Sequence, residues 1–130
     1  MIRGYGHGAG RVVLGLPSGA IEPGESAVEA AARELLEETG YAGPELKSLD
    51  SSLVEPGRQH AVAHVVVERN ARGVGEPRSD ASERFELRLV ESRHFLRTVL
   101  AAGAVSLAMV AAMSVAILGG EAATPRRPNE

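Results

Sequence analysis

Three glutamates are spaced so that a helix would gather them on one side. At 100° per residue, Glu34, Glu37 and Glu38 fall within an arc of about 100°. The opposite side of the same segment is mostly apolar and carries Val28, Ala32, Leu35, Leu36 and Thr39. Neighbouring carboxylates repel one another by a few tenths of a kcal/mol per pair, and a hard divalent cation such as Mg²⁺ would convert that repulsion into binding. The spacing is also compatible with a solvated acidic helix face, so both interpretations stand at this point.

The segment that must position these glutamates has clear helix boundaries. Ser26 and Glu29 have the S-x-x-E spacing of a capping box, and Gly40 suits the left-handed position beyond a last helical turn. We therefore expect a helix over residues 27–39. A loop over residues 18–25, which contains two glycines and a proline, precedes it.

The string from Gly19 to Tyr41, GAIEPGESAVEAAARELLEETGY, resembles the Nudix box. That family pattern is G, five residues, E, seven residues, then R-E-U-x-E-E-x-G-U, where U is a bulky hydrophobic residue. All nine specified positions are met over 23 residues. The resemblance implies an α/β fold, an α/β/α sandwich around a mixed β-sheet that is short at its N-terminus. It also implies a Nudix hydrolase domain over residues 1–120, followed by a flexible tail over 121–130.

The resemblance also implies roles for individual residues. The expected ligands of Mg²⁺, or of Mn²⁺, are the Ser18 carbonyl and the side chains of Glu25, Glu34, Glu37 and Glu38. Glu34 and Glu38 would be the principal ligands, Glu37 a further ligand or the catalytic base, and Glu25 a support for the helix entrance or for a second metal. Arg33 would hold a carboxylate in place by a charge-assisted pair and contact the substrate. Gly19 would let the loop turn closely against the helix, beside the substrate.

A subfamily is indicated by the residues on either side of the box. Leu16-Pro17-Ser18-Gly19 resembles the L-P-[AG]-G lead-in of ADP-ribose pyrophosphatases, although Gly15 stands where that group commonly has glutamate. Residues 82–90 resemble the acidic loop and following strand of the same group. There Glu83 is the best match to a glutamate that orients water and contacts substrate, with Glu86 second and ordinary surface charge as the alternative.

These resemblances imply a Mg²⁺-dependent pyrophosphohydrolase that cleaves the diphosphate of a nucleoside diphosphate derivative. The first candidate substrate is ADP-ribose or a similar nucleotide sugar. Two alternatives stay open. One is a nucleoside triphosphate pyrophosphohydrolase, and the other is a nucleotide-binding Nudix module without turnover. Only eighteen residues precede Gly19, so we expect a shortened substrate site or one completed by a partner in a homodimer.

Composition limits the other classes of function. The net charge is −3 and the chain has four aromatic residues, so nucleic acid is not an expected partner. The absence of cysteine excludes disulfides, thiolate metal sites and a cysteine nucleophile.

The first residues lack an apolar run typical of a secretory signal, so we expect a cytoplasmic protein. Residues 99–120 carry no charge over 22 positions, but they are rich in alanine, and a buried helix over 101–118 is favoured over a membrane span.

The remaining elements follow from shorter patterns. We expect strands over 11–16, within 44–54, over 60–68 as a well-buried strand, and over 85–90. A helix is expected over 91–99, a polar loop over 70–82, and a flexible hairpin turn over the glycine-rich residues 4–10. His60 and His64 lie about 13 Å apart in a strand, so they are not expected to share a metal.

Overall fold

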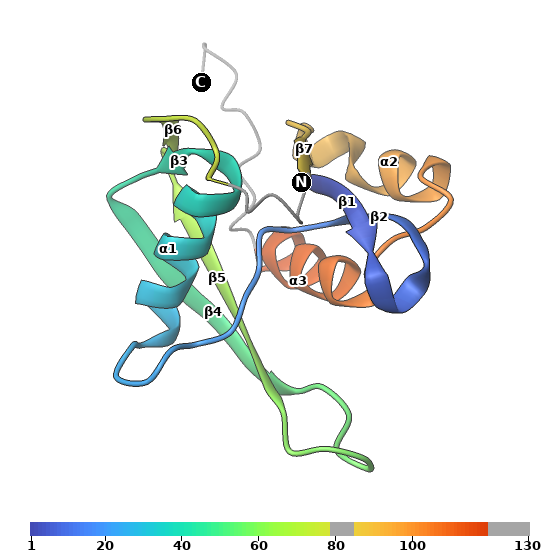
Figure 1. Ribbon diagram of the computed structural model, residues 1–130, viewed down its shortest axis with the longest axis horizontal. Helices are drawn as coiled ribbons and strands as arrows, with labels where there is room; N and C mark the ends of the chain where they lie inside the picture. The colour runs from blue at the N-terminus through green and yellow to red at the C-terminus, as the bar shows by residue number, and fades with distance from the viewer. Residues whose placement is uncertain (79–84, 120–130) are drawn as a thin grey trace. The chain divides into compact units, whose positions relative to one another are not determined.

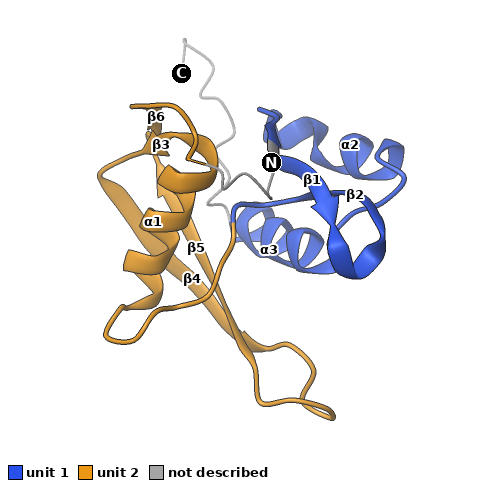
Figure 2. Ribbon diagram, in the orientation of Figure 1, with its two compact units in different colours: residues 1–17, 79–130 blue, residues 18–78 orange. Residues whose placement is uncertain are grey.

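A computed structural model describes residues 1–78 and 85–119, with only the backbone of Phe85 included. The chain forms two compact units, shown in Figure 2. Residues 18–78 make one unit. Residues 1–17 and 79–130 make the other, so the first unit is a continuous stretch of sequence set between the two parts of the second. Helices and strands occur in both units, which confirms the α/β class.

The unit of residues 18–78 consists of one helix and two antiparallel strand pairs. Helix α1 (Ala27–Thr39) is followed by the short strand β3 (Tyr41–Ala42) and the long strands β4 (Glu45–Leu53) and β5 (Val62–Arg69). Strand β4 pairs with β5 from Glu45↔Arg69 to Leu53↔Val62, with an irregularity between Ser48 and Asp50. Strand β6 (Arg72–Gly73) pairs with β3. Helix α1 packs beside this hairpin, as Figure 1 shows.

Helix α1 has the boundaries predicted from its caps. The Ser26 hydroxyl accepts a hydrogen bond from the Glu29 amide at 3.2 Å, and the Glu29 carboxylate accepts one from the Ser26 amide at 2.8 Å, so the capping box is complete. At the other end Gly40 has φ 71°, and its amide donates to the Leu36 carbonyl at 2.8 Å. Both ends of the helix that carries the three glutamates are thus fixed by local sequence.

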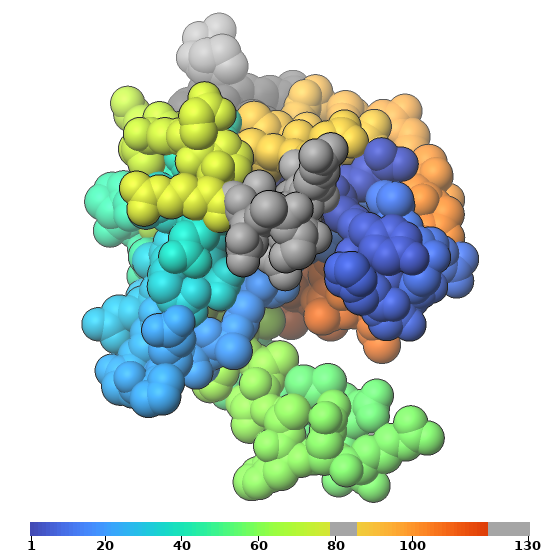
Figure 3. All heavy atoms as spheres, in the orientation of Figure 1, coloured from blue at the N-terminus to red at the C-terminus, as the bar shows by residue number. Residues whose placement is uncertain are grey.

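The valine-rich strand β5 is less buried than predicted. Val62 is 47% exposed, and the first three residues of the strand are all exposed. The reason is that β4 and β5 form a two-stranded ribbon whose outer end lies beyond α1. In Figure 3 the green tip of this hairpin projects from the rest of its unit. Within β5, only residues 65–68 are partly shielded from solvent.

The other unit contains a three-stranded antiparallel sheet and two helices. Strands β1 (Ile2–Gly6), β2 (Arg11–Gly15) and β7 (Phe85–Leu87) are arranged in the order β2-β1-β7. Helices α2 (Phe95–Ala101) and α3 (Leu107–Leu118) follow. A small core joins the sheet to the helices through Leu14, Phe95 and Met109, all buried. Leu14 also forms a parallel bridge with Val105.

Strand β1 corrects the prediction of a flexible turn over residues 4–10. Gly4 and Gly6 lie in β1, paired with Val13 and Arg11, and only a 3₁₀ turn at His7–Ala9 and Gly10 connects the strands. Gly10 has φ 63°, so the turn uses the conformational freedom of one glycine. Glycines within the strand concealed its pattern, because they carry no side chain from which alternation could be recognised.

The C-terminal helices also differ from prediction. A 3₁₀ turn occupies Ser92–His94, so the helix expected over 91–99 is displaced to Phe95–Ala101. The single helix expected over 101–118 is interrupted at Gly103, with φ 71°, and α3 begins only at Leu107. It is not buried all round, because Leu107 and Leu118 at its ends are exposed. No helix within residues 1–78 and 85–119 is long and apolar enough to cross a membrane.

Candidate functional site

The guanidinium of Arg33 lies at the centre of a network on α1. Its Nε and Nη2 donate to the two oxygens of Glu25 at 3.0 and 3.1 Å, a bidentate pair. Its Nη1 donates to Glu34 at 2.7 Å and more distantly to Glu37 at 3.4 Å. Its Nη2 also donates to the Ala20 carbonyl at 2.9 Å. One arginine therefore ties the helix to the loop before it and holds three of the predicted site carboxylates.

The charges of this network reinforce one another. Hydrogen bonds from Arg33, and then from the Glu22 amide, hold the pKa of Glu25 below its usual value. The same pairing raises the pKa of Arg33 further above its usual value, with Glu25 as the largest cause and Glu34 the next. The Glu25 and Glu34 side chains are 16% exposed, whereas that of Glu37 is 45% exposed. Glu25 and Glu34 are therefore held firmly, and Glu37 faces solvent with a weaker contact.

Gly19 lies directly against the Glu34 carboxylate. A Cβ atom built at residue 19 would lie 1.8 Å from Oε1 and 2.3 Å from Cδ of Glu34. Any larger residue would therefore displace that carboxylate. The close approach of loop and helix predicted from the sequence is present, and the space that a side chain at residue 19 would fill is taken by a glutamate oxygen.

Glu38 is joined to the start of the same loop. The Ser18 amide donates to Oε2 of Glu38 at 2.9 Å. This contact places the Ser18 backbone beside the second principal ligand predicted for a metal. The role predicted for the Ser18 carbonyl stays a prediction, whereas the amide contact was not anticipated from the sequence.

A segment after β6 binds the end of α1, and sequence reasoning missed it. The Val74 and Gly75 amides donate to the Gly40 carbonyl at 2.8 and 3.3 Å, and the Arg78 amide donates to the Glu37 carbonyl at 2.7 Å. A Cβ atom at Gly40 would lie 2.1 Å from the Gly75 carbonyl oxygen. The turn residues between 73 and 77 were the available signal, but they predicted only a loop and not its contact with the helix.

The structure brings together seven of the eight predicted site residues, namely Ser18, Gly19, Glu25, Arg33, Glu34, Glu37 and Glu38. Glu83 lies outside the described residues. Its alternative, Glu86, lies on β7 in the other unit and pairs with Arg3 at 3.2 Å. Within the described parts of the chain, no three acidic or histidine side chains are gathered closely enough to hold a metal ion in this arrangement. The glutamates instead bind Arg33 and backbone amides.

The donors present nevertheless suit a hard divalent cation. Glu34, Glu37 and Glu38 offer carboxylate oxygens from one face of one helix, and Mg²⁺ and Mn²⁺ prefer oxygen ligands. Gly19 leaves the Glu34 carboxylate uncovered by a side chain from the loop. To share one cation, these carboxylates would have to rotate away from their contacts with Arg33 and the Ser18 amide.

Comparisons with known proteins agree on one family. A model of the NUDIX domain matches residues 1–105. The chain is 44% identical over 57 residues to an ADP-sugar pyrophosphatase of Mus musculus, covering 44% of this chain and 26% of that protein. It is 31% identical over 93 residues to an ADP-ribose pyrophosphatase of Bacillus subtilis (strain 168), covering 64% of this chain and 50% of that protein. The chain thus spans from about a quarter to half the length of these relatives.

A solved structure shares the fold. The crystal structure of an ADP compounds hydrolase superposes with a TM-score of 0.72 at 25% sequence identity, covering 92% of this chain and 64% of that one. Because it covers 92% of the chain, the similarity extends beyond α1 and the loop before it to both units.

Proposed function

The chain belongs to the NUDIX family, and we propose that it hydrolyses the diphosphate of an ADP-sugar, with ADP-ribose as the first candidate, using Mg²⁺ or Mn²⁺. The products would be AMP and a sugar phosphate. The observation that carries this proposal is the network in which Arg33 holds Glu25 and Glu34 beside Gly19, with Glu37 and Glu38 on the same helix. The relatives named above, an ADP-sugar pyrophosphatase and an ADP-ribose pyrophosphatase, support the substrate class.

Glu34 and Glu38 would be the principal metal ligands, with Glu37 and the Ser18 carbonyl beside them and Glu25 near a second cation. A bound dication would supply charge neutralisation for the diphosphate oxygens during attack by water. The protein's own contribution is to keep the carboxylates charged and correctly placed. Arg33 does this for Glu25, because the bidentate pair lowers the pKa of that carboxyl, and its 2.7 Å contact holds the Glu34 carboxylate in place.

Glu37 is the best candidate for the base that takes the proton from water. Its side chain is 45% exposed and its contact with Arg33 is 3.4 Å long, so it has more freedom than Glu34 at 16% exposed and 2.7 Å. Water attacks one phosphorus, the bond from that phosphorus to the bridging oxygen breaks, and the proton passes to the carboxylate. Glu83 is proposed to contact substrate and help orient the water.

The test is incubation of the protein with ADP-ribose and Mg²⁺, followed by chromatographic measurement of AMP and ribose 5-phosphate. Glu38→Gln keeps the size of the side chain and removes its charge, and we expect the rate to fall by at least about 100-fold, as for loss of a principal transition-state interaction. Glu22→Gln makes the same chemical change at an exposed position before the helix and should leave the rate unchanged. An unchanged rate in Glu38→Gln would defeat the mechanism.

The same assay separates the alternatives. Faster cleavage of nucleoside triphosphates than of ADP-sugars would assign the chain to the triphosphate class. Nucleotide-dependent thermal shifts without products at any metal concentration would identify a binding module. A homodimer and a cytoplasmic location remain predictions, which light scattering and cell fractionation would test.

A further inference from the structure

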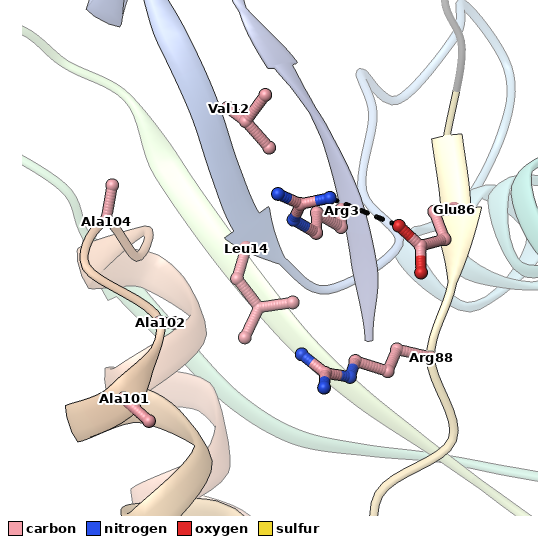
Figure 4. A pocket seen from close by; sticks show the side chains of 8 residues that line it. All are labelled: Arg3, Val12, Leu14, Glu86, Arg88, Ala101, Ala102 and Ala104. Carbon is pink, nitrogen blue, oxygen red and sulfur yellow. Dashed lines mark hydrogen bonds and ion pairs between the residues drawn. The ribbon is translucent and has the colours of Figure 1, made fainter.

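A cavity lies on the sheet of the unit that does not carry α1. Its volume is about 340 Å³, within the range of roughly 300–1,000 Å³ typical of small-molecule sites. The wall includes Arg3 from β1, Val12 and Leu14 from β2, Glu86 from β7 and Arg88 just after β7. Alanines at the end of α2 and in the turn that follows complete it, and Figure 4 shows this arrangement.

The register of the strands explains why these side chains share one face. Arg3 stands opposite Leu14 on β2 and opposite Glu86 on β7. Side chains of directly paired residues lie on the same face of a sheet, and residues two apart on a strand also share a face. Arg88 is two positions after Glu86, and its amide continues the pairing by donating to the Met1 carbonyl at 2.8 Å. The two arginines are therefore diagonal neighbours on the same face of the sheet.

The charges of the cavity are not balanced within it. Arg3 pairs with Glu86 at 3.2 Å. The Arg88 guanidinium has no hydrogen bond or ion pair with any of the described residues, although its backbone is bound to Met1. The two arginines and one glutamate leave a single positive charge, and Figure 4 shows both arginine side chains extending into the same space. An arginine is the residue best suited to grip phosphate, through its planar set of donors.

We propose that this cavity binds a small phosphomonoester, with Arg88 and Arg3 on the phosphate and the organic part against Val12 and the alanines. The volume of about 340 Å³ accommodates more than a phosphate group alone. The site is separate in sequence from the acidic helix and requires no metal, so it goes beyond the hydrolysis proposed above and stands or fails independently of it. Glu86 limits the affinity, because it occupies Arg3 and repels an anion.

The test is a calorimetric titration of the whole chain with inorganic phosphate and with ribose 5-phosphate, in the presence of EDTA so that the acidic helix holds no metal. We expect saturable binding, with ribose 5-phosphate several-fold tighter than inorganic phosphate. Arg88→Ala should weaken it by about fivefold, the scale of an exposed charge-assisted contact. Arg97→Ala removes the same charge from an exposed position of α2 outside the cavity and should change the affinity for ribose 5-phosphate less than twofold.

Glu86→Gln provides a result of the opposite sign. It removes the repelling charge and releases Arg3, so ribose 5-phosphate should bind more tightly than in the unmodified protein. Equal weakening by Arg88→Ala and Arg97→Ala, equal affinity for the two ligands, or weaker binding in Glu86→Gln would each overturn the proposal. Circular dichroism and thermal melting of each variant confirm that the compared proteins are folded.

Discussion

Replacement of Gly19 by alanine tests the geometry of the candidate site with a single added methyl group. The new Cβ would lie 1.8 Å from Oε1 of Glu34, the oxygen that accepts the 2.7 Å hydrogen bond from Arg33. An ordinary contact requires about 3.4 Å, so the carboxylate oxygen must move by about 1.6 Å. Glu34 is a flexible side chain and Gly19 does not have a positive φ, so the backbone tolerates the change.

The magnitude follows from that displacement. A misplacement of about 1 Å in a catalytic group costs about 100-fold in rate, equivalent to about 2.7 kcal/mol of transition-state stabilisation. The folding free energy should change by less than about 1 kcal/mol, because the lost hydrogen bond of Glu34 is offset by the reduced entropy of the unfolded chain. We therefore expect Gly19→Ala to lose most of its activity while its folding free energy changes little.

The assay is the initial rate of AMP release from ADP-ribose with Mg²⁺, together with Mn²⁺ binding followed by electron paramagnetic resonance. The metal titration reports on the site even if the substrate has another identity. Gly15→Ala is the matched control, because a Cβ there meets nothing within 4 Å and its φ is not positive. If Gly19→Ala keeps at least half of the rate and of the Mn²⁺ affinity shown by Gly15→Ala, the placement of Glu34 against the loop has no functional consequence and the reasoning is refuted.

Three further substitutions test the supports of the helix by urea unfolding. Ser26→Ala removes half of the capping box and should lower the free energy of unfolding by about 1 kcal/mol at constant m-value; no change would show that the cap is dispensable. Glu25→Gln should destabilise the protein at neutral pH. The difference from the unmodified protein should begin to shrink as the pH falls below 4.5 and vanish once the pH is below the lowered pKa of folded Glu25, because the carboxylate is then protonated in both states. A constant difference across this range contradicts the pairing. Gly40→Ala combines φ 71° with a Cβ 2.1 Å from the Gly75 carbonyl oxygen, whereas Gly10→Ala has φ 63° and open space. Gly10→Ala should lower the free energy of unfolding by about 1 kcal/mol, and Gly40→Ala should lower it by more. Equal losses would mean that the backbone at Gly75 moves aside without cost.

The acidic helix could be predicted to the residue because everything that defines it is local. Ser26 and Glu29 cap the start, Gly40 ends the last turn, and the apolar positions repeat with helical spacing between them. Most of the candidate site was predictable for the same reason, since its residues lie in or just before one helix. What sequence could not supply were contacts to backbone atoms, such as those of Arg33 with the Ala20 carbonyl and of Glu38 with the Ser18 amide.

Elements that depend on distant partners were predicted less well. Strand β1 contains glycines and becomes a strand because both of its edges pair, with β2 and with β7. In the apolar run after residue 99, Ser106 is the N-cap of α3 but its side chain makes no capping hydrogen bond, and backbone contacts with Leu14 hold the chain at the interruption near Gly103. The Leu14 amide donates to the Ala104 carbonyl, and its carbonyl accepts from the Ser106 amide. Such tertiary hydrogen bonds leave no periodic signal in the sequence.

The separations in sequence of the contacts described above differ greatly between the two units. Arg33 reaches Glu25 over eight residues and the Ala20 carbonyl over thirteen, and Ser18 reaches Glu38 over twenty. Arg3 and Glu86, by contrast, are 83 residues apart. Closing a short loop costs less chain entropy than closing a long one, and local contacts form faster during folding. The acidic network can therefore assemble on the ribosome before the final strand of the other sheet has been synthesised.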